Sequence, residues 1–176
     1  MDKPMPDLHF RFMKFGLKFR DYFAPRRDIL LEIGMEPGSV VLDFGCGPGG
    51  YVAAASEMTG ASGKVYALDI HPRAVESVRR LAAKKRLTNV ETFLSAHDTG
   101  LPDGSVDVVL LYDILHMLED QESILRELRR VLKPDGILSF SDHHMKEPDI
   151  ISELTRSGLF ELARKGKKTY TFTKCG

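Results

Sequence analysis

A short apolar run, a glycine-rich loop and an alanine-rich segment follow one another between residues 40 and 58, and no other feature of the sequence constrains the fold as strongly. Val40-Val41-Leu42 is typical of a short buried strand. Glycines then stand at positions 45, 47, 49 and 50, and residues 51–58 favour a helix. Glycines in such a loop let the backbone turn sharply and approach a ligand closely. The sequence therefore predicts a strand–loop–helix unit of an α/β protein.

The rest of the chain continues this alternation of strands and helices. Further strands are expected at 64–68, 90–94, 106–111 and 137–141, with helices after Pro72, after a cap at Asp120 and over 148–157. Residues 133–136 are expected to end the helix before the fifth strand, and 160–164 with 169–172 to form a terminal hairpin. We therefore predict one Rossmann-like α/β domain, with its core at 39–176 and a mostly parallel seven-stranded sheet that ends in an antiparallel hairpin.

Length and charge narrow the class of protein. The 176 residues suit one domain, and 25 basic residues balance 25 acidic ones, so the overall charge favours neither a nucleic acid nor an anionic membrane as partner. Cys46 and Cys175 are too few for a disulfide framework and have no zinc-site spacing. The first residues lack the apolar core of a signal peptide, and charges interrupt the apolar stretch 106–118, so we expect no transmembrane segment and a cytoplasmic location.

Polar residues follow each predicted parallel strand. In open α/β sheets, ligands bind at the carboxyl ends of the strands. After the glycine loop of the first strand, the residues at these positions are Asp69, Ala96-His97-Asp98, Tyr112-Asp113 and Asp142-His143-His144. We expect them to surround one site.

The glycine loop alone fits two cofactor classes. Gly45, Gly47 and Gly50 match the dinucleotide fingerprint, and Asp69 could accept from ribose hydroxyls in either class. Asp43 is an awkward charge beside a pyrophosphate, although it suits a ligand that carries an ammonium and a sulfonium. No separate block remains for the catalytic domain that a dehydrogenase normally needs. A nicotinamide-dependent oxidoreductase is therefore the weaker alternative.

Three stretches together carry a family resemblance. Residues 40–49, VVLDFGCGPG, closely resemble motif I of the class I S-adenosylmethionine-dependent methyltransferases. Residues 101–109, LPDGSVDVV, resemble the family's approach to its fourth strand, and 132–138, LKPDGIL, the start of its fifth. The resemblance runs from about Ser39 to His143 in order and spacing. It is closest to the small-molecule branch that includes quinone-ring and arsenite methyltransferases, and a methyltransferase-like module without catalysis is a further alternative.

The resemblance implies S-adenosylmethionine as cofactor and places its methionine half at the glycine loop. There the backbone of Gly45, Cys46 and Gly47 would meet the methionine half. Asp43 would lie near the ammonium group, as would the main chain at Tyr112.

The resemblance also implies which residues contact the adenosine half of the cofactor, and at one of these positions the sequence departs from the family. Asp69 would take the ribose hydroxyls, and Ile70 would pack on the adenine. The family usually has an aspartate after its third strand that accepts from the adenine amino group, but here that position falls on Ala96 or His97, depending on the alignment. Asp98 comes one or two residues later. His97 and Asp98 are therefore the predicted contacts at the adenine edge.

Methyl transfer is an in-line displacement, so the enzyme mainly has to align the acceptor, and a base is needed only where the acceptor must lose a proton. His116 and His143 are the best-placed bases, although a lone histidine after a strand is more often a hydrogen-bonded loop residue. Adjacent side chains on an extended chain face opposite ways, so we expect no metal at His143-His144. The acceptor is expected to be a small molecule, and the sequence does not identify it.

The first 30 residues contain an amphipathic pattern. Apolar residues recur every three or four positions over 8–23: Leu8, Phe12, Phe15, Phe19 and Tyr22. This predicts a helix. It could pack on the sheet edge, form a lid over the acceptor site, or contact a membrane surface or RNA with its basic face.

Overall fold

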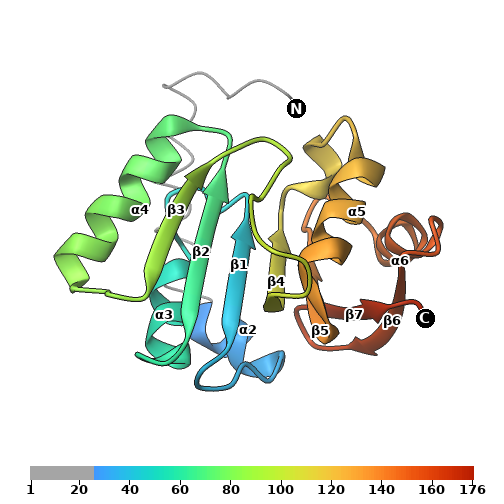
Figure 1. Cartoon of the computed structure of the whole chain (residues 1–176). Coiled ribbons are helices and arrows are strands. Elements are labelled where there is room, and N and C mark those ends of the chain that lie inside the picture. The colour runs from blue at the N-terminus through green and yellow to red at the C-terminus, as the bar shows by residue number, and fades with distance from the viewer. Residues whose placement is uncertain (1–25) are drawn as a thin grey trace.

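The computed structural model describes residues 26–176, which form a seven-stranded sheet with helices on both faces (Figure 1). The strand order is β3-β2-β1-β4-β5-β7-β6. The strands are β1 (Val40–Phe44), β2 (Lys64–Asp69), β3 (Val90–Leu94), β4 (Val106–Tyr112), β5 (Leu132–Ser141), β6 (Phe160–Lys165) and β7 (Tyr170–Lys174). The first five are mutually parallel, and β7 pairs antiparallel with both β5 and β6. The predicted α/β fold with its antiparallel C-terminal hairpin is confirmed.

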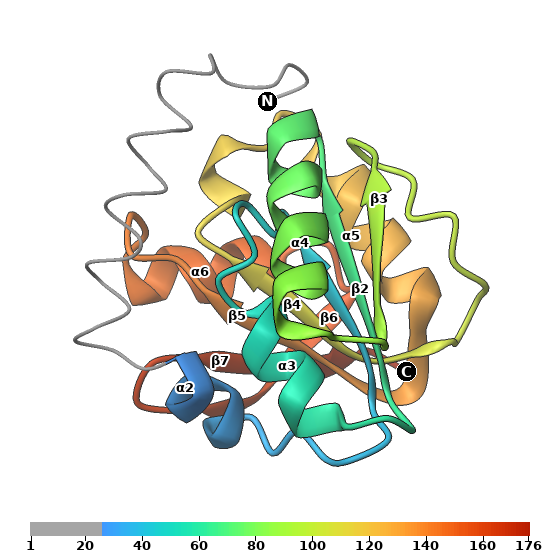
Figure 2. The same cartoon turned by 90° about the vertical axis from the view of Figure 1, so that its left-hand side faces the viewer.

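The helices divide between the two faces of the sheet (Figures 1 and 2). They are α2 (Arg26–Glu32), α3 (Val52–Thr59), α4 (Pro72–Lys85), α5 (Gln121–Val131), α6 (Glu147–Thr155) and the short 3-10 helix η1 (Leu115–Met117). One apolar cluster joins α2, α3 and α4 to the sheet, and a second joins α5 and α6 to its other face. Both clusters include residues of β4, which explains its nearly uniform apolar sequence. The helix predicted over 8–23 lies outside the described residues, and within 26–176 no helix has the length and hydropathy to span a bilayer.

Side-chain caps fix the first turns of two helices. Asp120 accepts a hydrogen bond from the backbone N–H of Ser123 at 3.0 Å, as the sequence predicted for α5. In α4, Nδ1 of His71 accepts from the N–H of Arg73 at 3.1 Å, and Pro72 occupies the first helical position. These caps set where the loops after β2 and η1 end.

The prediction for the start of β5 was wrong in one respect. Helix α5 does end before residues 133–136, but these residues belong to β5 rather than to a turn before it. Val106 pairs with Leu132 and Val108 with Ile137, so 133–136 form a large bulge opposite Asp107. A turn-forming sequence can also form a bulge, and the pattern does not distinguish the two.

The topology places two features at the carboxyl edge of the sheet. Strand order reverses between β1 and β4, which leaves a crevice at their carboxyl ends. Because β7 runs antiparallel to β5, with Tyr170 opposite Phe140, the turn between β6 and β7 reaches the same edge.

Candidate functional site

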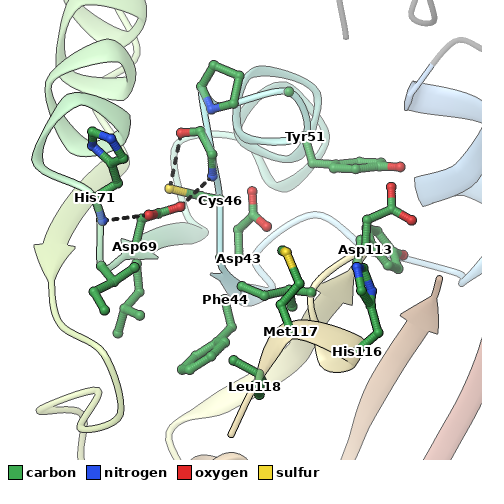
Figure 3. A pocket seen from close by; sticks show the side chains of 18 of the residues that line it. Asp43, Phe44, Cys46, Tyr51, Asp69, His71, Asp113, His116, Met117 and Leu118 are labelled. Carbon is green, nitrogen blue, oxygen red and sulfur yellow. Dashed lines mark hydrogen bonds between the residues drawn. The ribbon is translucent and has the colours of Figure 1, made fainter. Parts of the chain in front are cut away.

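A cavity of about 470 Å³ lies at the carboxyl ends of the parallel strands (Figure 3). Residues that follow all five strands line it, together with Arg26 of α2. The predicted site residues among them are Asp43, Gly45, Cys46, Gly47, Asp69, Ile70, Tyr112, His116 and His143. The structure therefore brings together most of the residues that the sequence selected.

The loop after β1 needs its glycines for conformation and for space. Gly45 has φ +77° and Gly47 has φ +52°, in the left-handed region that disfavours side chains. A Cβ at Gly45 would also clash with the side chain of Ile114. The N–H groups of Gly45 and Cys46 donate to the carbonyl of Leu68 at 2.8 and 3.0 Å, which ties the loop to β2. The loop is thus held with its backbone against the cavity.

Asp43 is a buried carboxylate directed at this cavity (Figure 3). It is 3% exposed, and its Oδ2 has no hydrogen-bond partner among residues 26–176. Burial raises the pKa of Asp43 to about 7, against the opposing effect of the Arg26 guanidinium, while nearby Asp69 raises it further. A buried oxygen without a donor is costly unless a ligand supplies one, so the position suits a cationic hydrogen-bond donor.

The carboxylate of Asp69 is held by backbone N–H groups. Gly47 donates to Oδ2 at 2.8 Å, and His71 donates to Oδ1 at 2.7 Å. Burial raises the pKa of Asp69, and these two bonds lower it. Each carboxylate oxygen can accept more than one hydrogen bond, so Asp69 keeps capacity for ligand hydroxyls. Ile70 lines the cavity beside it.

Arg26 is a site residue that the sequence did not reveal. Its guanidinium lies 4.2 Å from the centroid of the Tyr51 ring and close to the backbone of Gly50. The ring of Tyr51 in turn lies 4.7 Å from that of Tyr112. In the sequence Arg26 is one basic residue in a basic segment, and only the packing of α2 beside the glycine loop singles it out. The cavity therefore contains a cation as well as the carboxylate of Asp43.

Tyr112 has a structural side chain. Its hydroxyl hydrogen-bonds Oγ of Ser139 at 2.6 Å, and burial raises the pKa of the phenol well above its usual value. The phenol is therefore neutral and is unsuited to act as a base. The main-chain contact that the resemblance implies for Tyr112 does not need the phenol, and it stays a prediction.

A buried aspartate orients His116. Nδ1 of His116 lies 2.6 Å from Oδ2 of Asp142, whose side chain is fully buried, whereas that of His116 is 27% exposed. The other oxygen of Asp142 accepts from the backbone N–H of His144 at 3.0 Å. An ionised carboxylate can only accept, so Nδ1 carries the proton, and Nε2 of the neutral ring is left as an acceptor.

His143 follows β5 and pairs with an aspartate that follows β4, the reverse of the His116–Asp142 pair. It is also more exposed than His116. Its Nδ1 lies 2.6 Å from Oδ1 of Asp113, which also accepts from the His143 backbone N–H at 3.1 Å. Here the histidine side chain is 58% exposed. Asp113 has φ +55°, an uncommon conformation for a residue with a side chain. Two bonds to one carboxylate oxygen tether the loop after β5 to that after β4.

The side chains of the adjacent histidines do not face opposite ways, so the sequence prediction for them was wrong. The rings of His143 and His144 lie side by side with centroids 3.9 Å apart, and the ring of His144 is 4.5 Å from that of His116. The chain turns after β5 instead of remaining extended, so the side chains do not alternate. Within residues 26–176, no three His, Cys, Asp or Glu side chains are placed to share a metal ion.

His97 and Asp98 lie outside the residues that line the cavity. Ser95 and Ala96 line it instead. Oδ1 of Asp98 accepts from the N–H of Gly100 at 2.8 Å, which closes a turn. The adenine contacts assigned to His97 and Asp98 stay predictions, and the cavity offers Ser95 and Ala96 at that edge.

Comparisons with known proteins agree on one family. The family profile described as "Methyltransferase domain" matches residues 35–174. Demethylmenaquinone methyltransferase of Geobacillus stearothermophilus is 30% identical over 130 residues, which cover 73% of this chain and 56% of that protein. Aklanonic acid methyltransferase DauC of Streptomyces sp. is 32% identical over 124 residues, covering 69% and 56%. The chain spans little more than half the length of these relatives.

One solved structure is matched over a larger share of its length than these two relatives are. The crystal structure of a SAM-dependent methyltransferase from Aquifex aeolicus superposes with a TM-score of 0.77 at 27% identity. The match covers 86% of this chain and 90% of that one. The similarity therefore extends over the whole α/β core.

Proposed function

Because the chain belongs to the class I S-adenosylmethionine-dependent methyltransferases, we propose that it transfers a methyl group from this cofactor to a small-molecule acceptor. The observation that carries the proposal is the buried carboxylate of Asp43, whose Oδ2 has no partner among the described residues. It lies in a cavity that also contains the Arg26 guanidinium and the glycine loop. A zwitterionic amino-acid group beside a nucleoside matches this distribution of charge.

The residues at the glycine loop fit the methionine end of the cofactor. Asp43 accepts from the ammonium group, and Arg26 pairs with the carboxylate. Gly45 and Gly47 leave the backbone bare where a side chain would occupy the cavity or strain the loop. The opposite charges of Asp43 and Arg26 in one cavity would orient the amino-acid group, because reversing it would place like charges together.

The residues after β2 and β3 fit the adenosine end. Asp69 retains acceptor capacity for the two ribose hydroxyls, while its existing bonds to Gly47 and His71 fix its orientation. Ile70 supplies an apolar surface for the adenine. With His97 and Asp98 outside the cavity, we assign the adenine edge to Ser95 and Ala96.

The bound cofactor supplies a methyl carbon that its sulfonium group already activates. The chain's own residues align the acceptor and keep water away, and alignment is worth roughly 7–11 kcal/mol in comparable reactions. Where the acceptor loses a proton, His116 takes it at Nε2, since Asp142 holds Nδ1–H and stabilises the imidazolium that forms. His143 has the more exposed side chain, and we assign it a tethering role.

Two relatives support a small-molecule acceptor. Their names refer to demethylmenaquinone and to aklanonic acid. A quinone precursor and aklanonic acid are both small molecules, and a hydroxyl or an acidic carbon that gives up a proton would need a base. This agrees with the role proposed for His116.

Calorimetry tests the cofactor assignment. The wild-type protein should bind S-adenosylhomocysteine and show no measurable binding of NAD. Because hydrogen bonds to a charged group are worth roughly 1.5–3 kcal/mol, Asp69→Ala should weaken binding at least about tenfold. Asp135→Ala, at an exposed carboxylate in the β5 bulge, is the matched control and should bind like wild type.

Three results would contradict the proposal. Binding of NAD in place of S-adenosylhomocysteine would favour the oxidoreductase alternative. Unchanged affinity in Asp69→Ala would remove the ribose assignment. Cofactor binding without transfer of label from methyl-tritiated S-adenosylmethionine to any phenol or quinol acceptor would favour a module without catalysis.

A further inference from the structure

A second cavity of about 240 Å³ lies beside the first, at the end of β5. Met145 and Ile150, near the start of α6, form an apolar wall. Three lysines also line the cavity: Lys165 at the end of β6, and Lys167 and Lys168 in the β6–β7 turn. His143 lines both cavities, so the two adjoin at this residue. We call this space the lysine cavity.

The turn that carries the lysines is fixed in place. Oε1 of Glu32 on α2 accepts from the N–H groups of Lys168 and Thr169 at 3.1 and 3.0 Å, and from Oγ1 of Thr169 at 2.7 Å. Gly166 lies so close to this carboxylate that a Cβ there would overlap it. Figure 2 shows the turn beside α2. The lysines therefore project from a held backbone at the carboxyl edge of the sheet.

The charges that face the lysine cavity are unbalanced. Lys165 is paired with Glu147 at 2.5 Å. No hydrogen bond or ion pair is found for the ammonium groups of Lys167 and Lys168 within residues 26–176. Asp142 also lines the cavity, but its two oxygens are already bonded to His116 and to the backbone of His144. Among residues 26–176, the exposed ammonium groups of Lys167 and Lys168 therefore have no counter-ion.

We propose that the lysine cavity binds an anionic group of the methyl acceptor, a carboxylate or a phosphate, through Lys167 and Lys168. The rest of the acceptor passes the apolar wall and His143, so that its nucleophilic atom lies in the first cavity near His116. The acceptor is then an anionic small molecule with an apolar or aromatic body, such as a hydroxylated aromatic acid. The position given to the nucleophilic atom rests on the proposed function. The binding of the anion depends only on the lysine cavity.

Paired ligands that differ in charge test this assignment. The full-length protein, saturated with S-adenosylhomocysteine, is titrated calorimetrically with 4-hydroxybenzoate, phenyl phosphate and the neutral 4-hydroxybenzamide. Saturation prevents the anions from binding at Arg26. Since charge-assisted hydrogen bonds are about twice as strong as neutral ones, at least one anion should bind roughly tenfold more tightly than the amide. The difference should shrink as salt is raised.

Substitutions locate the effect. Lys167→Ala and Lys168→Ala should each lower the affinity for the anion by about threefold or more, and the double variant should remove the preference over the amide. The double Lys→Arg variant should retain it. Lys84→Ala, on the exposed last turn of α4, removes one charge far from the cavity and should change nothing.

The outcomes separate this inference from the proposed function. Equal affinity for anions and amide, absence of binding by all three probes at about 10 mM, or a preference that survives in the double alanine variant would overturn the lysine cavity as an anion site. Failure to bind S-adenosylhomocysteine would overturn the proposed function. In that case the anion titrations without cofactor, compared between the wild type and the double alanine variant, would still decide the inference, because Arg26 is the same in both proteins.

Discussion

The ends of β1 and β2 and the loops after β4 and β5 both place carboxylates at the carboxyl edge of the sheet, but the two regions bond them differently. In the first region Asp69 is held by backbone N–H groups, and Asp43 has an oxygen without a partner. In the second region Asp113 and Asp142 are each paired with a histidine side chain. Backbone donors give a rigid site that suits an unchanging ligand. Side-chain pairs can be replaced without refolding a loop, which suits an acceptor that differs between relatives.

The two Asp–His pairs of the second region also differ from each other. Each connects the loop after β4 to the loop after β5, in opposite directions. The His116–Asp142 pair has a fully buried carboxylate, whereas the His143 side chain is more than half exposed. A base needs an oriented ring shielded from water, so the buried pair is the one suited to proton transfer.

The largest expected effect is on turnover, and it distinguishes the two Asp–His pairs. His116→Gln should lower turnover by about 10²–10⁴-fold with an acceptor that loses a proton, the usual contribution of a general base. His143→Gln should lower it less than about threefold, since it loses a tether and no base. Steady-state methyl transfer measures both, with cofactor affinity checked to be unchanged. Equal losses in the two variants would contradict the division of roles.

The backbone-held region is tested by a change that adds one methyl group. In Gly45→Ala, the new side chain would stand on a backbone with φ +77° and would clash with Ile114. Cofactor affinity should therefore fall by about fiftyfold or more. Gly34→Ala is the matched control, because it has φ +74° but nothing within 4 Å of the added atom. It should lower the melting temperature by a few degrees and leave affinity unchanged. Calorimetry that shows the same affinity for both variants would refute the role of the loop.

Much of the first region was predictable from the sequence, and less of the second. Asp43, the glycine loop and Asp69 stand at fixed distances from strand ends, so local pattern places them. Arg26 depends on how α2 packs, and the His116–Asp142 pair joins residues 26 positions apart. The sequence selected His116 and His143 equally, because it shows neither the burial of their partners nor the turn that brings His143 against His144. Ser95 and Ala96 line the cavity edge where the sequence pointed to His97 and Asp98, because the course of the loop after β3 decides which residues face the cavity.

The N-terminal segment is tested by removing it. Residues 8–23 lie outside the described part of the chain, and their role as a lid stays a prediction. If their aromatic face closes the acceptor pocket, deletion of residues 1–23 should leave a folded protein that binds cofactor, with turnover lowered about tenfold or more because water reaches the reacting centre. Melting temperature, affinity and turnover are compared with the full-length protein. Full turnover in a folded truncation would exclude a lid, and loss of folding would favour a packing helix.

A smaller effect follows from the pKa of Asp43. Its carboxyl takes up a proton near pH 7 in the folded state, and only the ionised form pairs with an ammonium group. Cofactor affinity should therefore rise about tenfold between about pH 6 and 8. The same raised pKa makes the ligand-free protein less stable as pH rises from about 4 to about 7, since over that range the folded state binds more protons than the unfolded one. Asp43→Asn should flatten both profiles, and a pH dependence unchanged in this variant would assign the effect to another group.

The most direct test of the central claim is a crystal structure of the protein with S-adenosylhomocysteine bound. The account predicts the amino-acid end between Asp43 and Arg26, with its ammonium group on Oδ2 of Asp43. It also predicts both ribose hydroxyls on Asp69 and the thioether sulfur facing the side of the cavity lined by His116. A ligand bound with its amino-acid group away from Asp43, or a nicotinamide dinucleotide retained in this cavity instead, would contradict the account.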